Sequence, residues 1–165
     1  SDNGRVKMIV CRPDQGERTV LQEATFKTEV GLVGDNWLAR GSRHTEDGKA
    51  HRGMQVAIMN SRVIGLIAED ESRWRLAGDQ LYLDLDLSAE NLPVGQRIML
   101  GSVILEVTDV PHNGCGKFTA RFGSSATRFV NSKDGRAMRM RGVNTKVVQG
   151  GTIRVGDTVQ KGAKV

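Results

Sequence analysis

Apolar and polar side chains alternate in several short runs of this chain, which is the period of a half-buried β-strand. The clearest run, VILEVT, occupies positions 103–108. From this pattern we predict strands at Arg5–Cys11, Met54–Met59, Arg97–Leu100, Val103–Thr108, Arg139–Val148 and Thr152–Arg154, with a last strand beginning at Asp157. Gly101-Ser102 has the composition of a two-residue hairpin turn. The short strands and the 20 glycines together predict a mostly β fold with many turns.

Signals for helices are fewer. Asn60 and Ser61 are suited to cap a helix, and the apolar residues that follow have the spacing of one buried face: Val63, Ile64, Leu66, Ile67 and Trp74. Two further short helices are predicted at Lys117–Phe122 and Ala126–Asn131. The segment Leu83–Leu87 alternates leucine with aspartate, which predicts a strand or extended edge with Asp84 and Asp86 toward solvent. No repeat or linker divides the chain, so we expect one domain, 1–165.

One long segment, Trp37–Gly53, has no regular pattern. Irregular segments above roughly 12 residues are usually functional or disordered. This one contains several cationic or titratable side chains, namely Arg40, Arg43, His44, His51 and Arg52. Two interpretations therefore stay open: a flap that presents cationic groups to an anion, or a disordered surface loop.

The chain is basic, with a net charge of +5 and a pI near 9.6. Such chains attract nucleic acid, anionic membranes or small anions. Aromatic residues make up only 4% of the chain, too few for base-stacking platforms, so a small anionic ligand is favoured over nucleic acid. No apolar run approaches the ~20 residues of a membrane span, and the first residues lack a signal-peptide core. With two cysteines and no disulfide framework, we expect a cytoplasmic protein.

The segment Pro111–Phe118 carries the most chemistry. Cys115 lies between two glycines, after a predicted strand, with His112 three residues before it and Lys117 two residues after it. Glycine permits close approach of a ligand, and neighbouring imidazole and ammonium groups favour the reactive thiolate. Cys115, His112 and Lys117 are therefore our candidate catalytic residues. The alternative is a buried cysteine that acts as a small hydrophobe, which is what we expect of Cys11.

Several segments in a characteristic order resemble the MOSC family, named for the C-terminal domain of molybdenum-cofactor sulfurase, and its stand-alone bacterial type above all. The matching residues are Gly31–Asp35, Gln55-Val56 with Met59-Asn60, Ala89–Leu92, Gly101 with Leu105–Thr108, Pro111 and Cys115 with Lys117-Phe118, Arg141–Val143, Gly150-Gly151 and Ile153–Asp157. The chain departs from the family pattern at Asn36-Trp37, Ala89 and Gly114, and His112 is an addition.

The resemblance implies a MOSC-like antiparallel β-barrel with short peripheral helices. It also implies that Cys115 is the signature cysteine, which binds molybdenum in a pterin cofactor or carries sulfur; Cys115 is thus the candidate metal ligand. Arginine forks hold phosphate well, and candidates for the cofactor's phosphate are Arg52, Arg128, Arg136, Arg139 and Arg141, of which Arg52 and Arg141 are favoured. Asn91 either bonds the cofactor or caps a turn.

The leading functional hypothesis is an enzyme that reduces N-hydroxylated compounds or transfers sulfur without pyridoxal phosphate. Reduction would need an external redox partner, because no flavin, haem or iron–sulfur motif is present. In sulfur transfer, Cys115 would attack or carry sulfur while His112 moves protons. The alternatives are a metal-free cysteine enzyme acting on C–S bonds and a non-catalytic basic barrel that binds an anion or nucleic acid. Zinc is disfavoured, because the histidines and Cys115 match no compact zinc pattern.

Overall fold

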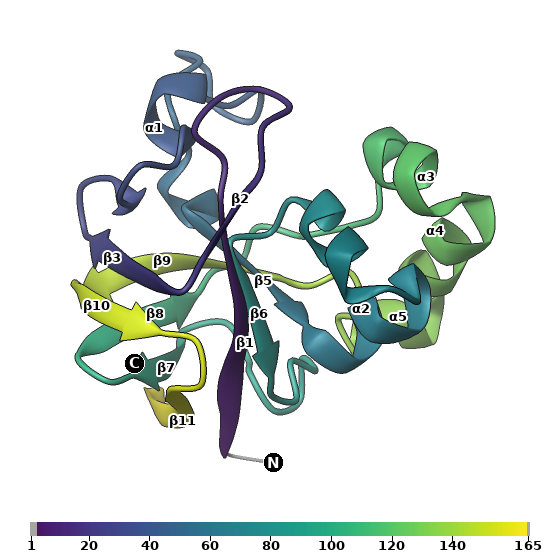
Figure 1. Ribbon diagram of the computed structural model, residues 1–165. Helices are drawn as coiled ribbons and strands as arrows, with labels where there is room; N and C mark the ends of the chain where they lie inside the picture. Colours follow the sequence, from purple (N-terminus) through teal and green to yellow (C-terminus); the bar gives the residue numbers. More distant parts are fainter. Residues whose placement is uncertain (1–2, 165) are drawn as a thin grey trace.

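The central element of the structure is a β-sheet that closes on itself (Figure 1). The computed structural model describes residues 3–164. The strand order is β11-β7-β8-β9-β5-β6-β1-β2, and β1 also pairs with β11, which closes seven of these strands into a barrel. The strands are β1 (Asn3–Cys11), β2 (Thr19–Leu21), β5 (Val56–Asn60), β6 (Leu81–Asp84), β7 (Gln96–Leu100), β8 (Val103–Val107), β9 (Val143–Gln149) and β11 (Thr158–Lys164).

A second, smaller sheet lies against the barrel and has the order β10-β3-β4, with β3 at Glu23–Lys27, β4 at Gly31–Leu32 and β10 at Gly151–Arg154. All strand pairs in both sheets are antiparallel except β5–β6, which is parallel. A parallel pair needs a crossover connection, and here the helical segment between β5 and β6 supplies it. The expected antiparallel barrel is confirmed, with this one exception.

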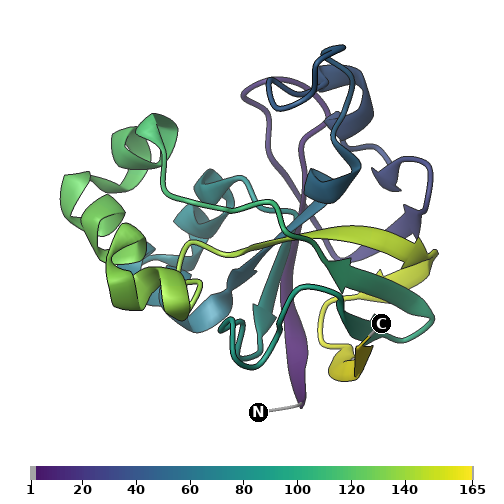
Figure 2. The same cartoon turned by 180° about the vertical axis from the view of Figure 1, so that it is seen from behind.

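The helical segments are α1 (Trp37–Arg40), η1 (Arg52–Met54), α2 (Ser61–Ala68), η2 (Glu71–Ala77), α3 (Gly116–Phe122), α4 (Ser124–Asn131) and α5 (Lys133–Ala137). Helices α2 to α5 gather on one side of the barrel, whereas α1 lies apart from them near β2 and the end of β1 (Figures 1 and 2). Among residues 3–164, no helix has the length and apolar character needed to cross a bilayer.

Strand β1 belongs to two hydrophobic cores. Val6 and Ile9 face the barrel interior, whereas Met8 and Val10 face a second cluster against α2 and η2. An irregularity in the β1–β6 pairing between Val6 and Met8 shifts the alternation, so that Val6 and Ile9 share one face although three residues separate them. In the second cluster, Tyr82 donates a hydrogen bond from its hydroxyl to the Trp74 carbonyl at 2.8 Å. Burial on both faces therefore fixes β1 firmly in the fold.

Several predicted boundaries are wrong, each for a local reason. The strand expected at Met54–Met59 begins at Val56, because Arg52–Met54 forms a 3₁₀ turn capped by His51. The strand expected from Arg139 begins at Val143, since 139–142 form a turn. The helix expected to reach Trp74 ends at Ala68, where Glu69 has a positive φ of 61°, and η2 follows separately.

Other expectations agree more closely. The helices predicted around 117–122 and 126–131 are present as α3 and α4, and the 101–102 turn joins β7 to β8. The aspartate–leucine segment alternates as predicted: its leucines are buried, Asp84 forms an ion pair with Arg62 at 2.8 Å, and Asp86 caps the Ser88 amide at 2.9 Å. The sequence pattern missed β2, β3, β4, α1 and α5, which are two to five residues long; α1 lies inside the segment 37–53 that was expected to be irregular.

The turn that leads into β9 depends on Gly142, which has φ 124°. A Cβ atom there would lie 2.3 Å from the Ile58 carbonyl oxygen and 3.0 Å from atoms of both Asp79 and His112. Only glycine fits this combination of backbone angle and close approach. The start of β9 is thus held directly against the side chains that line the candidate site.

We therefore expect Gly142→Ala to lower the free energy of unfolding by about 2–4 kcal/mol, since it combines backbone strain with steric overlap. The matched control is Gly101→Ala, which also has a positive φ (60°) but no heavy atom within 4 Å of the added Cβ; its cost should be about 1 kcal/mol. Urea unfolding of both variants measures the difference, and equal losses would contradict the role assigned to Gly142.

Candidate functional site around Cys115

Cys115 lies at the end of the loop that connects β8 to α3 and precedes the first residue of α3. The loop is fixed by Asn131 of α4, whose side-chain oxygen accepts from the Gly114 amide at 2.8 Å and whose Nδ2 donates to the Gly114 carbonyl at 2.9 Å. A Cβ on Gly114 would approach Val130 to 3.0 Å, so the backbone packs closely here. Cys115 itself is exposed, in contrast to the buried Cys11.

A cavity of about 360 Å³ opens beside Cys115, and we call it the Cys115 pocket. Four separate parts of the chain supply most of its lining: the segment after β1, helix α1, the end of η2, and helix α3. Asp14 is the single carboxylate in this lining, against six cationic side chains: Arg12, Arg18, Arg40, Lys117, Arg121 and Arg141. The pocket is therefore strongly electropositive and suited to an anion.

The thiol of Cys115 is poised to ionise. Partial burial by itself would raise its pKa, but the backbone N–H groups of Phe118 and Lys117 and the charge of Arg141 outweigh that effect, so the pKa lies below its ordinary value of 9.0. For Cys11, burial and the charge of Asp35 raise the pKa instead. Because the thiolate is the form that attacks electrophiles and binds metals, only Cys115 combines exposure with reactivity.

The arginines of the pocket are crowded. Burial, followed by the charge of Arg12, lowers the pKa of Arg40 to about 10, and the same two causes lower the pKa of Arg18. The Nε atoms of Arg18 and Arg141 are buried and have no hydrogen-bond partner in the described chain. Unpaired buried donors and mutual repulsion both cost free energy. An oxyanion bound among these side chains would offset the repulsion between them.

Asp35 holds the rim of the pocket in place. Its carboxylate is fully buried and accepts hydrogen bonds from the backbone amides of Arg12 (2.8 Å) and Trp37 (3.1 Å) and from the Gln80 side chain (3.2 Å). The Arg12 Nε also lies 3.7 Å from the carboxylate. Since these contacts join the end of β1, the start of α1 and the residue before β6, one aspartate fixes three of the segments on which the pocket depends.

Beneath the pocket, Asp79 forms a buried network with Arg141 and His112. The Asp79 carboxylate is 2.7 Å from Arg141 Nη1 and 3.1 Å from His112 Nε2. Arg141 also donates to the Ala77 carbonyl at 3.0 Å, and its guanidinium lies 5.0 Å from the ring centre of Phe118. These contacts fix the guanidinium of Arg141, which lines the pocket.

The network also fixes the protonation of His112. Burial and the charge of Arg141 lower the pKa of His112 below its ordinary value of 6.5, despite the opposing effect of Asp79. Burial opposes ionisation of Asp79, but Arg141 and His112 keep its pKa below the ordinary 3.8, so the carboxylate accepts and does not donate. The neutral imidazole therefore carries its proton on Nε2 and donates it to Asp79.

The family model for the MOSC domain matches residues 56–160, which is more than half of the chain. The chain belongs to the MOSC domain family. A comparison with curated protein sequences finds no significant match. The fold of this MOSC domain resembles that of the YuaD protein from Bacillus subtilis, with TM-score 0.68 and 15% identity over 95% of this chain and 94% of that one.

Two further solved structures share the fold of the MOSC domain. YiiM from Escherichia coli aligns with TM-score 0.61 and 16% identity over 98% of this chain and 71% of its own. YiiM from Geobacillus stearothermophilus aligns with TM-score 0.65 and 12% identity over 97% and 75%. At these identities the likeness is one of fold.

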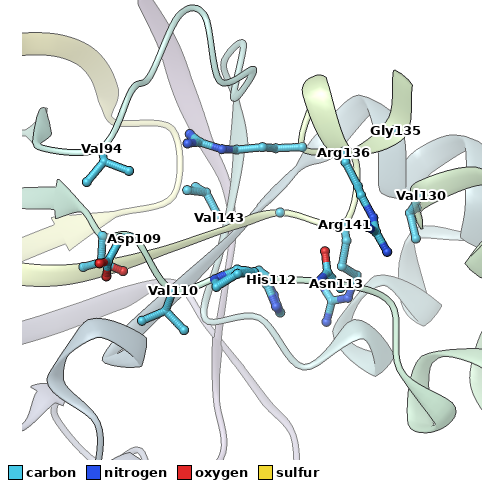
Figure 3. Close-up of a pocket in the computed structure, with 14 residues that line it drawn as sticks. Val94, Asp109, Val110, His112, Asn113, Val130, Gly135, Arg136, Arg141 and Val143 are labelled. Carbon is cyan, nitrogen blue, oxygen red and sulfur yellow. The ribbon is translucent and has the colours of Figure 1, made fainter. Parts of the chain in front are cut away.

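The MOSC fold brings together only part of the residues singled out from the sequence. Cys115, Lys117 and Arg141 share the Cys115 pocket. His112 is not among the lining residues of that pocket; it lines a second cavity (Figure 3), and Arg141 contributes to both. The structure shows no contact between His112 and Cys115, so the role of His112 as proton acceptor for Cys115 stays a prediction.

The two remaining favoured residues lie elsewhere. Arg52 donates to the carbonyls of Val147 (3.0 Å) and Thr28 (3.4 Å) and braces the sheet. Asn91 donates from its side-chain amide to the Asp86 carbonyl at 2.7 Å. Neither residue lines the cavities described here.

Sequence reasoning missed four of the six cations of the pocket as members of one site: Arg12, Arg18, Arg40 and Arg121. Of these four, only Arg40 lies in a segment that the sequence pattern already suggested could present cations to an anion, the irregular 37–53 segment. Of the other arginine candidates, Arg136 and Arg139 line the second cavity, whereas the exposed Arg128 lies 3.4 Å from the Ser125 hydroxyl on its own helix.

Alkylation tests the ionisation of Cys115. Iodoacetamide should modify Cys115 with a rate whose midpoint lies below pH 9.0, because the surrounding amides and Arg141 stabilise the thiolate. Cys11 should stay unmodified in the folded protein, since it is buried and its pKa is raised. Peptide mass spectrometry across a pH series measures both sites, and a Cys115 midpoint at or above 9.0 would contradict this interpretation.

The buried neutral His112 should make stability depend on pH. The unfolded chain takes up a proton at this imidazole near pH 6.5, and the folded chain does so only at lower pH. The free energy of unfolding should therefore fall as pH is lowered from 6.5 toward the folded pKa. In His112→Gln this decline should be smaller than in the wild type, whereas His44→Gln, a change on an exposed loop, should keep it; denaturant titrations at each pH provide the measurement.

Proposed function

We propose that this MOSC domain binds the molybdenum-pterin cofactor in the Cys115 pocket, with the Cys115 thiolate as the protein's ligand to the metal. The observation that carries the proposal is an exposed, readily ionised cysteine placed among six cationic side chains. Thiolate is a soft ligand that suits redox-active metals, and arginine forks suit phosphate. The pocket thus offers both kinds of group that this cofactor needs.

The residues present fit the cofactor in size and in charge. A volume of about 360 Å³ lies within the range of small-molecule and cofactor sites. Arg18 and Arg141 both line the pocket, and each has a buried Nε without a hydrogen-bond partner in the described chain. Within residues 3–164 no group of three or more His, Cys, Asp or Glu side chains is placed to hold a metal ion. A metal bound by Cys115 would therefore take its remaining ligands from the cofactor.

When bound, the cofactor supplies the redox chemistry. Cys115 would anchor the metal, and Arg141, held by Asp79, would keep a fixed positive charge beside it. Lys117 at the start of α3 would stabilise further negative charge on the cofactor or on a substrate, and Phe118 would exclude water from one wall. We propose that the reaction is the reduction of N-hydroxylated compounds, with electrons from an external redox partner. A free reactive thiol suits the reducing, cytoplasmic setting expected above.

Sulfur chemistry at Cys115 is a second candidate function, and one observation favours it specifically. The thiolate is stabilised by backbone amides and Arg141 without any contact to His112, so it needs no partner base to become a nucleophile. In this version Cys115 attacks or carries sulfur, while Lys117 and Arg141 stabilise the negative charge that develops.

Metal and pterin analysis separates the two candidates. The protein is purified from a host that makes the cofactor, as wild type, Cys115→Ser and Cys11→Ala. We expect molybdenum and pterin in the wild type, at least a tenfold loss in Cys115→Ser because the metal ligand is gone, and retention in Cys11→Ala, whose cysteine is buried away from the pocket.

Thermal unfolding of each variant confirms that it is folded. Equal metal content in wild type and Cys115→Ser would overturn the assignment of the ligand. If neither protein contains metal or pterin despite ample cofactor, the molybdenum proposal fails. Cys115 is then tested as a metal-free nucleophile: attack of its thiolate on the outer sulfur of thiosulfate would form a Cys115 persulfide and release sulfite, and mass spectrometry would detect one added sulfur atom that a reducing thiol removes.

A further inference from the structure

The second cavity lies between the β8–α3 loop, helices α4 and α5, and the turn before β9 (Figure 3). Its volume is about 390 Å³, and we call it the His112 cavity. The proposed binding of a cofactor at Cys115 leaves it unused, because the two cavities share only Arg141 among their lining residues. Its walls combine valine side chains with charged and polar groups, which is the composition of a ligand site.

His112 presents a hydrogen-bond acceptor in this cavity. Its Nε2 is occupied by Asp79 at 3.1 Å, and the ring is 18% exposed. Because Asp79 is an acceptor, Nε2 carries the ring proton and Nδ1 keeps a lone pair. No residue of the described chain donates to Nδ1. A ligand that contacts the His112 ring can therefore use Nδ1 as an acceptor, and Asp109 of the same loop adds a carboxylate to the lining.

Cationic groups face these acceptors. Arg136 of α5 is exposed and forms no ion pair with any residue between 3 and 164, and it lines the cavity together with Arg139 and Arg141. Arg139 gives one of its N–H groups to the Leu92 carbonyl and keeps the others. The lining thus contains positively charged side chains, which attract an anion, and hydrogen-bond acceptors, which need an N–H or O–H donor from the ligand. An anion without a donor would leave the acceptors unpaired, at a cost.

We propose that the His112 cavity is a second ligand site, specific for a small oxyanion that carries an O–H or N–H donor beside its charge. The arginines hold the charge, and His112 Nδ1 accepts the donor. The simplest member of this class is hydrogen phosphate. The cavity is much larger than that ion, and Val94, Val110 and Val130 line the remainder, so the natural ligand has an apolar portion as well.

The site is independent of the chemistry proposed at Cys115. Arg141 is the one lining residue that the two cavities share, and the ligand class follows from His112 and the arginines of the His112 cavity. Failure of cofactor binding at Cys115 would leave this second site intact, and failure of this site would leave the Cys115 pocket intact.

The experiment uses the three histidines as reporters. ¹H–¹⁵N spectra of the imidazoles of the full chain are recorded at pH 7 while hydrogen phosphate or sulfate is added at constant ionic strength, and the His112 signal is assigned with His112→Gln. Sulfate at this pH has no O–H to donate. We expect phosphate to shift His112 in a saturable way and to bind about tenfold more tightly than sulfate, the value of one hydrogen bond. His44 and His51, outside the cavity, should not respond.

Two charge-matched variants on one helix test the arginine contribution. Arg136→Gln should weaken phosphate binding at least fivefold, whereas Lys133→Gln removes the same charge from α5 at a position that does not line the cavity and should leave binding unchanged. Cys115→Ser should also leave it unchanged.

Three results would overturn the proposal: equal affinity for sulfate and phosphate, an unmoved His112 signal, or equal weakening by both α5 variants. A further arm uses protein loaded with the molybdenum-pterin cofactor. Retained phosphate binding supports a separate ligand, whereas abolished binding means that the cofactor's own phosphate fills the cavity, which refutes a second ligand site.

Discussion

The carboxylate of Asp79 is 1% exposed, and the surroundings of both cavities follow from the need to neutralise it. Burying a charge is costly unless it is paired and hydrogen-bonded. Arg141 and His112 meet this need from two different segments, one before β9 and one after β8. The pairing fixes the guanidinium that faces Cys115 and the imidazole that faces the second cavity. A single buried charge thus fixes Arg141, which lines both cavities, and His112, which lines the second one.

In the Cys115 pocket, unlike at Asp79, the charged side chains are only partly paired. Asp79 is paired fully, whereas the arginines around Cys115 are paired only in part, and burial with mutual repulsion lowers the pKa of Arg18 and Arg40. Asp35 fixes the neighbouring backbone without neutralising the group, so the positive charge is held in place. Groups whose pKa values are strongly shifted by burial and by neighbouring charges commonly mark a functional site.

The sequence predicts those site residues whose signal lies in neighbouring positions of the chain. The period of two before Cys115 and the flanking glycines located the reactive loop, and the family segments located Arg141. His112 was paired with Cys115 because three residues separate them, but such a spacing brings side chains together on a helix, and 109–115 is not helical. Arg12 and Asp79 carried no local signal, since only the closed barrel brings them to the site. Arg52 and Asn91 lie near family segments, yet backbone carbonyls occupy them.

Closure of the barrel through β1 and β11 has a consequence for the order of events in the cell. The Cys115 pocket draws on residues from Arg12 to Arg141, so it exists only after distant parts of the chain have met. Contacts of such long range form slowly and late in folding. A nascent or partly folded chain therefore lacks the assembled pocket. A ligand can be bound there only when the chain is folded, and it would then raise the free energy of unfolding of the domain by mass action.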